Sequence, residues 1–288
     1  MVRRSGGRAL KGVQMSCAGE RLQHHPFDAA TAVVRTEEGW VGEIGQAYWG
    51  GRAPFGGATA AMILRAVLDH PERSGDPLAL TVNFCAPITR GRLSVHPWLT
   101  QANRSTQHWS ATLRQGDKCA ATASVVTADR KPSWSHQAAR MPQASPSDAL
   151  PVHVREGPPW IAQYEFRFAS GEPAPARSDA ALGGARSVAW MCDRPRRPLD
   201  ALSLTALSDA FFGRLVHVRG QASRAGTVSL TTHFHVGADA LAAEDAGQVL
   251  GVADGRVFHE GYSDQTGELW SPSGRLLATT SQVAFYRT

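Results

Sequence analysis

Small and apolar side chains occupy nearly every position of residues 58–68, so no continuous polar face runs along this segment. This pattern predicts a helix that is buried on most of its sides. The proline of Asp69-His70-Pro71 then ends the helix. Before it, strand-like segments separated by glycines predict a hairpin over residues 29–48. After it, extended segments predict an antiparallel meander at residues 78–86, 91–101, 106–115 and 118–128.

The second half of the chain repeats this order of elements. Strand-like segments at residues 161–169 and 185–192 precede a helix predicted over residues 199–212, with Gly213 as its C-cap signal. Further strands are predicted at residues 227–236, 248–254, 256–263 and 276–287, with turns at residues 264–267 and 271–274. Each half therefore predicts one hydrophobic helix wrapped by an antiparallel sheet, an α+β arrangement.

The stretch between the two halves is rich in proline. Six prolines lie within residues 131–160, which predicts a linker that could pack across the sheet surface. The predicted organisation is therefore an N-terminal unit over residues 25–130, this linker, and a C-terminal unit over residues 161–288. Residues 1–24 are predicted to form a disordered or loosely packed tail.

Two short matches support a duplication. Residues 121–126 (ATASVV) resemble residues 278–283 (ATTSQV), and residues 80–84 (LTVNF) resemble residues 230–234 (LTTHF). Within the first match, an apolar Val125 stands where the second copy has Gln282, which carries an amide. This difference suggests that only the second half acquired a chemical role.

Composition narrows the classes of function. The net charge of +5 comes mostly from four basic residues ahead of the first acidic residue, and without them it falls to about +1, so a nucleic-acid surface is disfavoured. The four cysteines form no C-x-x-C pair, which disfavours a zinc site or a disulfide framework. No apolar stretch approaches the roughly 20 residues that span a bilayer. We therefore expect a soluble, cytoplasmic protein with neither nucleic-acid nor membrane partners.

Common catalytic signatures are missing from the sequence. It contains no G-x-S-x-G, no P-loop, no G-x-G-x-x-G after a strand and no H-E-x-x-H. Asp254 and His259 are interpreted as surface residues of a hairpin.

Three polar positions in the second half are better candidates. Asp209 is flanked by apolar residues in the predicted helix, and burial would raise its pKa toward the range of a general base. Thr227, Ser229 and Thr231 share one face of a strand by the period-two rule, and Gln282 stands in the terminal strand. Each could instead face solvent. Together, a carboxylate, a hydroxyl and an amide suit a site that activates water for attack on a carbonyl.

With these residues in view, the chain resembles the acyl-CoA thioesterase II family of double hot-dog proteins over roughly residues 25–288. Phe55-Gly56-Gly57-Ala58 is similar to the F-G-G start of the family's first helix. Asp209 falls on its helix aspartate and Gln282 on its terminal-strand glutamine. Thr227 falls on its strand threonine when Phe234-His235 is aligned with the family's W-F-H stretch. The resemblance implies two antiparallel sheets, each wrapped around one long helix.

One departure from the family leaves the hydroxyl open. Ser229-Leu230 replaces the family's aspartate–histidine pair, so the strand alignment could slip by two residues and favour Ser229 or Thr231.

The resemblance also implies a reaction. Asp209 would act as general base on a water held with Thr227 and Gln282, hydrolysing an acyl-CoA without a covalent intermediate. Backbone N–H groups at a helix N-terminus, where Gly56 and Gly57 permit close approach, would bind the oxyanion. No metal or redox cofactor is implied.

Other implications of the resemblance concern partners. CoA phosphates could meet an arginine, with Arg52, Arg90 and Arg104 as candidates. A homodimer or homotetramer is expected, because edge strands of hot-dog units commonly pair. The alternative is a non-catalytic double hot-dog that binds acyl thioesters or other ligands. An enoyl-CoA hydratase is disfavoured because the sequence has no D-x-N-x-x-H segment.

Overall fold

The structure is a computed structural model that describes residues 25–154, 156–173, 184–219, 224–244 and 247–287. The tail predicted over residues 1–24 lies outside the described residues. Among the described residues, no helix combines the length and the apolar character needed to cross a membrane.

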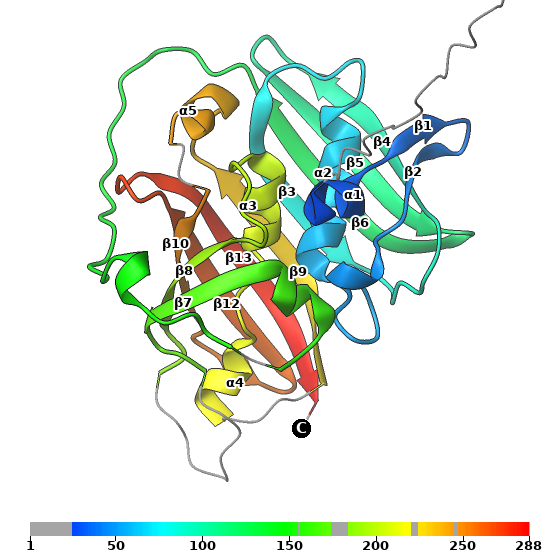
Figure 1. Cartoon of the computed structure of the whole chain (residues 1–288). Coiled ribbons are helices and arrows are strands. Elements are labelled where there is room, and N and C mark those ends of the chain that lie inside the picture. Colours follow the sequence, from blue (N-terminus) through cyan, green and yellow to red (C-terminus); the bar gives the residue numbers. More distant parts are fainter. Residues whose placement is uncertain (1–24, 155, 174–183, 220–223, 245–246, 288) are drawn as a thin grey trace, which may run out of the picture.

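The N-terminal half contains one long helix and an antiparallel meander, as predicted (Figure 1). Residues 29–31 differ from the prediction because they belong to a short helix, in which His25 Nδ1 caps the N–H of Phe27 and a proline stands in the first turn. The elements of this half are α1 (Pro26–Thr31), β1 (Val34–Thr36), β2 (Gly39–Gly42), η1 (Gln46–Tyr48), α2 (Gly56–Leu68), β3 (Asp76–Phe84), β4 (Leu93–Ala102), β5 (Thr106–Gln115) and β6 (Lys118–Ala128).

The C-terminal half repeats that arrangement around a shorter helix. Its elements are η2 (Ser147–Ala149), η3 (Pro159–Gln163), β7 (Tyr164–Ser170), β8 (Ser187–Asp193), α3 (Ala201–Leu207), α4 (Arg214–Arg219), β9 (Arg224–Phe234), α5 (Ala238–Ala242), β10 (Val249–Asp254), β11 (Phe258–His259), β12 (Tyr262–Trp270) and β13 (Leu276–Arg287).

The helix predicted over residues 199–212 is wrong at both ends. Asp200 is its N-cap, because its carboxylate accepts from the N–H of Ser203 in a capping box. At the other end the last turn tightens, since the N–H of Asp209 donates to the carbonyl of Ala206, three residues back. The C-cap is Ser208 rather than Gly213. Asp209 consequently lies just after α3, not within it.

The turn predicted over residues 264–267 is also wrong, because these residues lie inside β12. Asp264 instead stabilises a different loop. Its carboxylate accepts hydrogen bonds from the N–H groups of Arg256 and Val257, in the loop before β11. The turn predicted over residues 271–274 is confirmed by a hydrogen bond from the N–H of Gly274 to the carbonyl of Ser271.

All strand pairs are antiparallel, and the described strands form one 13-stranded sheet in the order β1-β2-β4-β5-β6-β3-β9-β13-β12-β10-β8-β7, with β11 on β12. This order is a palindrome of equivalent strands: β3 matches β9, β6 matches β13, and so on to the edges. The two matched sequences meet at the centre, where Thr81 pairs with Thr231 and their hydroxyls lie 3.0 Å apart. The topology confirms the duplication.

The two helices lie side by side between the curved half-sheets (Figure 1). Gly57 of α2 is close to the carbonyl of Ala206 in α3, whereas Arg65 and Leu68 of α2 line one cavity with Ala201 of α3. The start of α2 therefore lies against the end of α3, and the two helices run antiparallel. This packing creates two related places where a helix start meets a helix end.

The proline-rich segment covers the outer face of the C-terminal half-sheet. The indole N–H of Trp190 donates to the carbonyl of Ser145, and the side chain of Gln137 exchanges hydrogen bonds with Gly274 and Leu276. Met141, Ala144 and Leu150 pack on a small apolar cluster around Trp190 and Trp270. The segment therefore packs across the sheet surface.

Candidate functional site

A β-bulge decides which hydroxyl of β9 faces the helices. Val283 pairs with Ser229, but the next residue of β13, Ala284, pairs with Thr227, which leaves Val228 as an extra residue. Directly paired residues point to the same face, so Thr227 joins Leu230 on the core side while Ser229 and Thr231 point to the other. The period-two prediction, which placed all three hydroxyls on one face, is therefore wrong.

The amide of Gln282 stands on that same core face. Gln282 pairs with Leu230, just as Val125 pairs with Leu80 in the N-terminal half. The structure thus places Gln282 and Val125 at equivalent positions, as the short sequence match predicted. Only the C-terminal half presents an amide to the helices at this point.

Asp209 lies where the end of α3 meets the start of α2. Its side chain is only 7% exposed. A Cβ added to Gly56 would lie 2.6 Å from Asp209 Oδ2, and the N–H of Gly57 donates to the carboxylate. The positive end of α2 therefore faces the carboxylate, and glycine at position 56 leaves the space in which it stands.

The three predicted side chains meet at one point. The hydroxyl of Thr227 lies 3.3 Å from Asp209 Oδ1 and 3.2 Å from Gln282 Oε1, and Gln282 Nε2 lies 3.4 Å from Asp209 Oδ1. Ser229 and Thr231 take no part in these contacts: Thr231 is bonded to Thr81 on the opposite face of the sheet. The site combines both halves of the chain. Asp209, Thr227 and Gln282 come from the C-terminal half, and the start of α2, which contacts Asp209, comes from the N-terminal half.

Burial sets the electrostatics of the site. It raises the pKa of Asp209 from 3.8 to about 7, against the hydrogen bonds from Gly57 and Thr227, which lower it. A carboxylate with a pKa near neutral pH can both accept and return a proton there. The arrangement can therefore perform general acid–base chemistry on a molecule placed beside Oδ2.

Aromatic rings pack around the start of α2, and sequence reasoning missed them. Trp160 stacks on Phe55 with ring centroids 4.4 Å apart, and Tyr164 lies edge-on to Phe55 at 6.0 Å. Trp160 also lies 6.4 Å from Phe212, three residues after Asp209. The aromatic residues near the end of the proline-rich segment were a signal that this end packs against the core.

A second buried carboxyl lies on β8. Burial raises the pKa of Asp193 to about 7, and neither of its oxygens has a hydrogen-bond partner among the described residues. It pairs across the sheet with Tyr164. Asp193 therefore resembles Asp209 in burial and pKa, but it makes no contact with Thr227 or Gln282.

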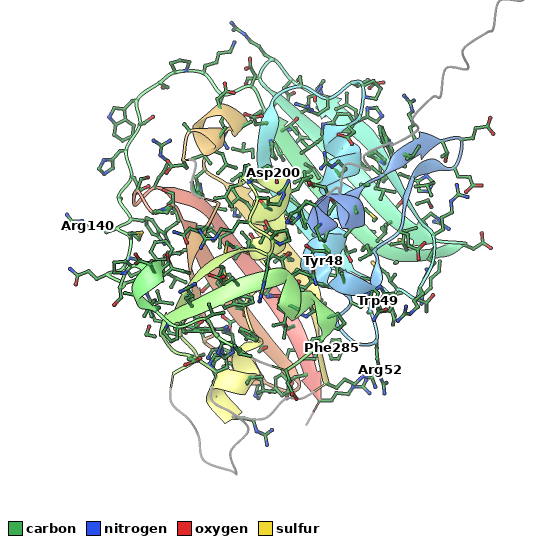
Figure 2. All side chains as sticks on the ribbon, in the orientation of Figure 1. Tyr48, Trp49, Arg52, Arg140, Asp200 and Phe285 are labelled. Atoms are coloured by element: carbon green, nitrogen blue, oxygen red, sulfur yellow. The ribbon has the colours of Figure 1, made fainter. Side chains whose placement is uncertain are left out.

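The three candidate arginines do not all lie in the same region of the structure. Arg52 lies on the exposed loop that leads into α2 (Figure 2), and the guanidinium of Arg90 lies 5.1 Å from the ring centroid of Trp49 in the same region. Arg104 lies in the β4–β5 turn next to Asp129, at the end of the sheet away from the start of α2. Arg52 and Arg90 thus lie in the region of the loop before α2, whereas Arg104 does not.

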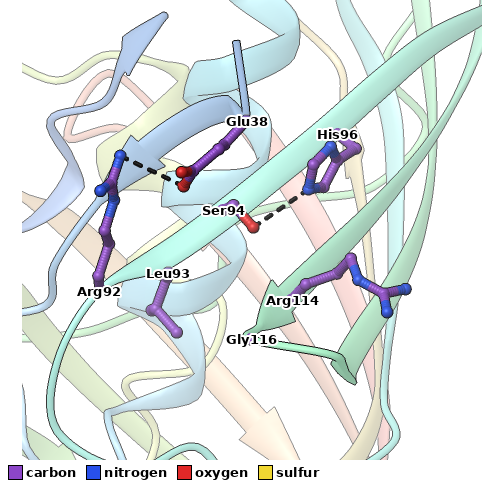
Figure 3. Close-up of a pocket in the computed structure, with 7 residues that line it drawn as sticks. All are labelled: Glu38, Arg92, Leu93, Ser94, His96, Arg114 and Gly116. Carbon is purple, nitrogen blue, oxygen red and sulfur yellow. Dashed lines mark hydrogen bonds and ion pairs between the residues drawn. The ribbon is translucent and has the colours of Figure 1, made fainter. Parts of the chain in front are cut away.

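Another hollow lies on the N-terminal half, where Ser94 and His96 of β4 are hydrogen-bonded at 3.1 Å (Figure 3). The carboxylate of Glu38 there pairs with Arg92 at 3.4 Å. Among the described residues His96 has no carboxylate partner to orient its ring, which a serine nucleophile site requires. Asp254 and His259, interpreted as surface residues, pair with neither each other nor the candidate site.

Comparisons with known proteins agree with the fold. The family model of the acyl-CoA thioesterase N-terminal domain matches residues 46–128, and that of the acyl-CoA thioesterase C-terminal domain matches residues 135–286. No curated protein matches the chain.

Three solved structures illustrate the likeness. A hot-dog protein of unknown function from Alicyclobacillus acidocaldarius is 38% identical with a TM-score of 0.86, covering 92% of this chain and 98% of its own. The tesB protein of Mycobacterium avium subs paratuberculosis is 17% identical with a TM-score of 0.73, covering 91% and 98%. Acyl-CoA thioesterase II TesB2 from Mycobacterium marinum is 17% identical with a TM-score of 0.70, also covering 91% and 98%. The predicted double hot-dog fold is confirmed.

Proposed function

Because the chain belongs to the acyl-CoA thioesterase family, we propose that it hydrolyses acyl-CoA thioesters at the site formed by Asp209, Thr227 and Gln282. The observation that carries the proposal is the meeting of these three side chains, within 3.4 Å of one another, at the positive end of α2. None of them is adjacent in sequence, and an apolar residue replaces the glutamine in the equivalent half.

The proposed reaction uses one water molecule. Asp209 takes a proton from the water through Oδ2, while Thr227 and Gln282 hold the carboxylate and orient the attacking oxygen. The oxygen attacks the thioester carbonyl carbon and gives a tetrahedral oxyanion, which N–H groups at the start of α2 stabilise. The C–S bond then breaks, and the proton returns from Asp209 to the CoA thiolate. The products are a free acid and CoA.

The test is thiol release from acyl-CoAs of increasing chain length. The wild-type protein should turn over at least one of them, and Gln282→Val, which installs the residue of the equivalent half, should lower kcat by about 10- to 100-fold. Binding of acyl-CoA with no turnover by the wild type would instead support the alternative, a non-catalytic ligand-binding protein.

We predict that Thr227→Val lowers kcat about 10- to 100-fold, because it removes the hydroxyl that contacts both Asp209 and Gln282. Ser229→Ala and Thr231→Val are the matched controls, since both hydroxyls point to the other face of the sheet. Steady-state kinetics of all three variants check this. A loss of activity in Ser229→Ala with a normal Thr227→Val would mean that the other strand register is the functional one.

We also predict that Arg52→Ala and Arg90→Ala raise KM for acyl-CoA, each by about tenfold, because each removes a charged donor to a phosphate. The value of kcat should not change, since the phosphates lie far from the reacting carbonyl. Arg104→Ala controls for the loss of one positive charge and should leave KM unaltered. An acyl thioester that lacks the nucleotide should be insensitive to all three substitutions.

A further inference from the structure

The antiparallel packing of α2 and α3 creates a second junction of a helix start with a helix end, at the opposite end of the helix pair. A cavity of about 370 Å³ lies there, lined among others by Leu68, Pro77 and Leu202. This volume is at the lower end of the range of about 300–1,000 Å³ typical of small-molecule sites. The cavity is the counterpart, within the duplicated fold, of the place that Asp209 occupies.

The equivalent residues show that this counterpart lacks the three polar side chains of the candidate site. Pro77 stands where the other half has Thr227, and the same bulge accompanies it, because Leu78 is an extra residue in β3 as Val228 is in β9. Val125 replaces Gln282. Leu64 is equivalent to Asp209 by sequence separation. It follows Phe55, the N-cap of α2, by the same number of residues as Asp209 follows Asp200, the N-cap of α3. This half therefore has apolar side chains in place of the carboxylate, the hydroxyl and the amide, and of the three replacements Pro77 lines the cavity.

Arg65 is a cation of this cavity without a polar side-chain contact to the part of the chain that the structure describes. Arg65 lines the cavity, its Nε is buried, and its guanidinium makes no hydrogen bond or ion pair with any described residue. The other arginine of the cavity, Arg73, donates to the carbonyls of Leu68 and Gly75. Leaving a buried guanidinium donor unpaired is costly, so the position favours an anionic ligand.

The acidic residues of the cavity do not neutralise Arg65. Asp200 accepts from the guanidinium of Arg197 and from the N–H of Ser203, and Asp76 accepts from the N–H of Ala238. Asp200 thus forms its ion pair with Arg197, and neither carboxylate forms an ion pair with Arg65. The remaining lining is mostly apolar and includes Leu241.

We propose that this cavity is a non-catalytic binding site for an aliphatic monocarboxylate of medium chain length, with its carboxylate on Arg65 and its chain against the leucines. The ligand belongs to the chemical class of the acid that the proposed reaction releases. Its binding does not depend on turnover, so the site is testable even if the hydrolysis proposal fails.

The experiment is calorimetric titration of the intact protein with octanoate, 1-octanol and octylamine. Octanoate should bind with one site per chain, and Arg65→Gln should weaken that binding at least tenfold. Ala242→Trp, at an exposed position that lines the cavity, should abolish it by filling the space. Arg73→Gln removes the same charge from the same cavity and should change the affinity less than threefold. The melting temperature of each variant checks that it is folded.

Other results would overturn the proposal. Equal binding of octanol, or preferred binding of octylamine, would show that Arg65 does not select an anion. Octanoate binding that ignores Arg65→Gln and strengthens in Asp209→Asn would place the acid in the candidate active site instead, because that substitution removes a repelling carboxylate there. Failure of the wild type to bind octanoate at millimolar concentration would exclude the site.

Discussion

Asp209→Asn is expected to lower kcat for acyl-CoA hydrolysis about a thousandfold or more, because it removes the carboxylate that takes a proton from water. General-base assistance contributes about 10²- to 10⁴-fold, and an asparagine cannot supply it. In the wild type, kcat should rise with pH through a midpoint set by the pKa of about 7 of Asp209. Thiol release measured between pH 5 and 9 checks both expectations.

The same substitution should stabilise the fold at alkaline pH. Since burial raises the pKa of Asp209 from 3.8 to about 7, the folded state holds a proton in this interval that the unfolded state releases. The wild type therefore loses stability as pH rises from about 4 to 7, by up to about 4 kcal/mol from this group alone. Asp209→Asn lacks that loss and should unfold at higher urea concentration than the wild type at pH 8.

Asp193→Asn is the matched control for both measurements. Asp193 is also buried and its pKa is also raised to about 7, so the substitution should flatten the pH dependence of stability in the same way. It should leave kcat unchanged, because Asp193 does not contact Thr227 or Gln282. If Asp209→Asn and Asp193→Asn lower activity equally, the loss reports general damage to the core rather than a missing base, and the proposed role of Asp209 fails.

Much of the fold can be predicted from the sequence, because local patterns of apolar and polar residues indicate many of its elements. The meander over residues 106–128 and the buried helix α2 are visible in alternation and in the run of small apolar residues. The sequence pattern predicts a helix α3 that is too long, because Ala210, Phe211 and Phe212 are apolar enough to continue it. Its end is set instead by a tightened hydrogen bond from Asp209 to Ala206, which leaves no trace in hydrophobicity. Likewise, Asp264 and Gly267 have turn chemistry but lie in a strand, because β13 and Phe211 pack closely against Gly267.

Part of the candidate site can also be predicted from the sequence, and the rest depends on the folded structure. Asp209, Thr227 and Gln282 are identifiable because polar residues stand in apolar surroundings or differ between the two copies. The bulge at Val228, which turns Thr227 toward the helices, depends on pairing with β13 and is invisible to a period-two rule. The contact between α2 and Asp209 joins residues far apart in the chain, so no local pattern could show that Gly57 donates to the carboxylate. The close approach of Asp209 Oδ2 to Gly56 is likewise a property of the folded chain.

The two adjacent glycines at the start of α2 are expected to respond differently to alanine. In Gly57→Ala the new Cβ would lie 2.6 Å from the carbonyl oxygen of Ala206, a backbone atom that cannot move without shifting α3, so we expect a loss of about 1–3 kcal/mol in the free energy of unfolding. In Gly56→Ala the Cβ would lie 2.6 Å from Asp209 Oδ2, which can swing away. That variant should lose less stability than Gly57→Ala, because only the tip of a side chain must move, but it should lose about 100-fold in kcat/KM because the carboxylate no longer stands beside the attacking water. Urea unfolding and steady-state kinetics on both variants separate these effects. Full activity in Gly56→Ala would show that the space at the start of α2 is not where the reaction takes place.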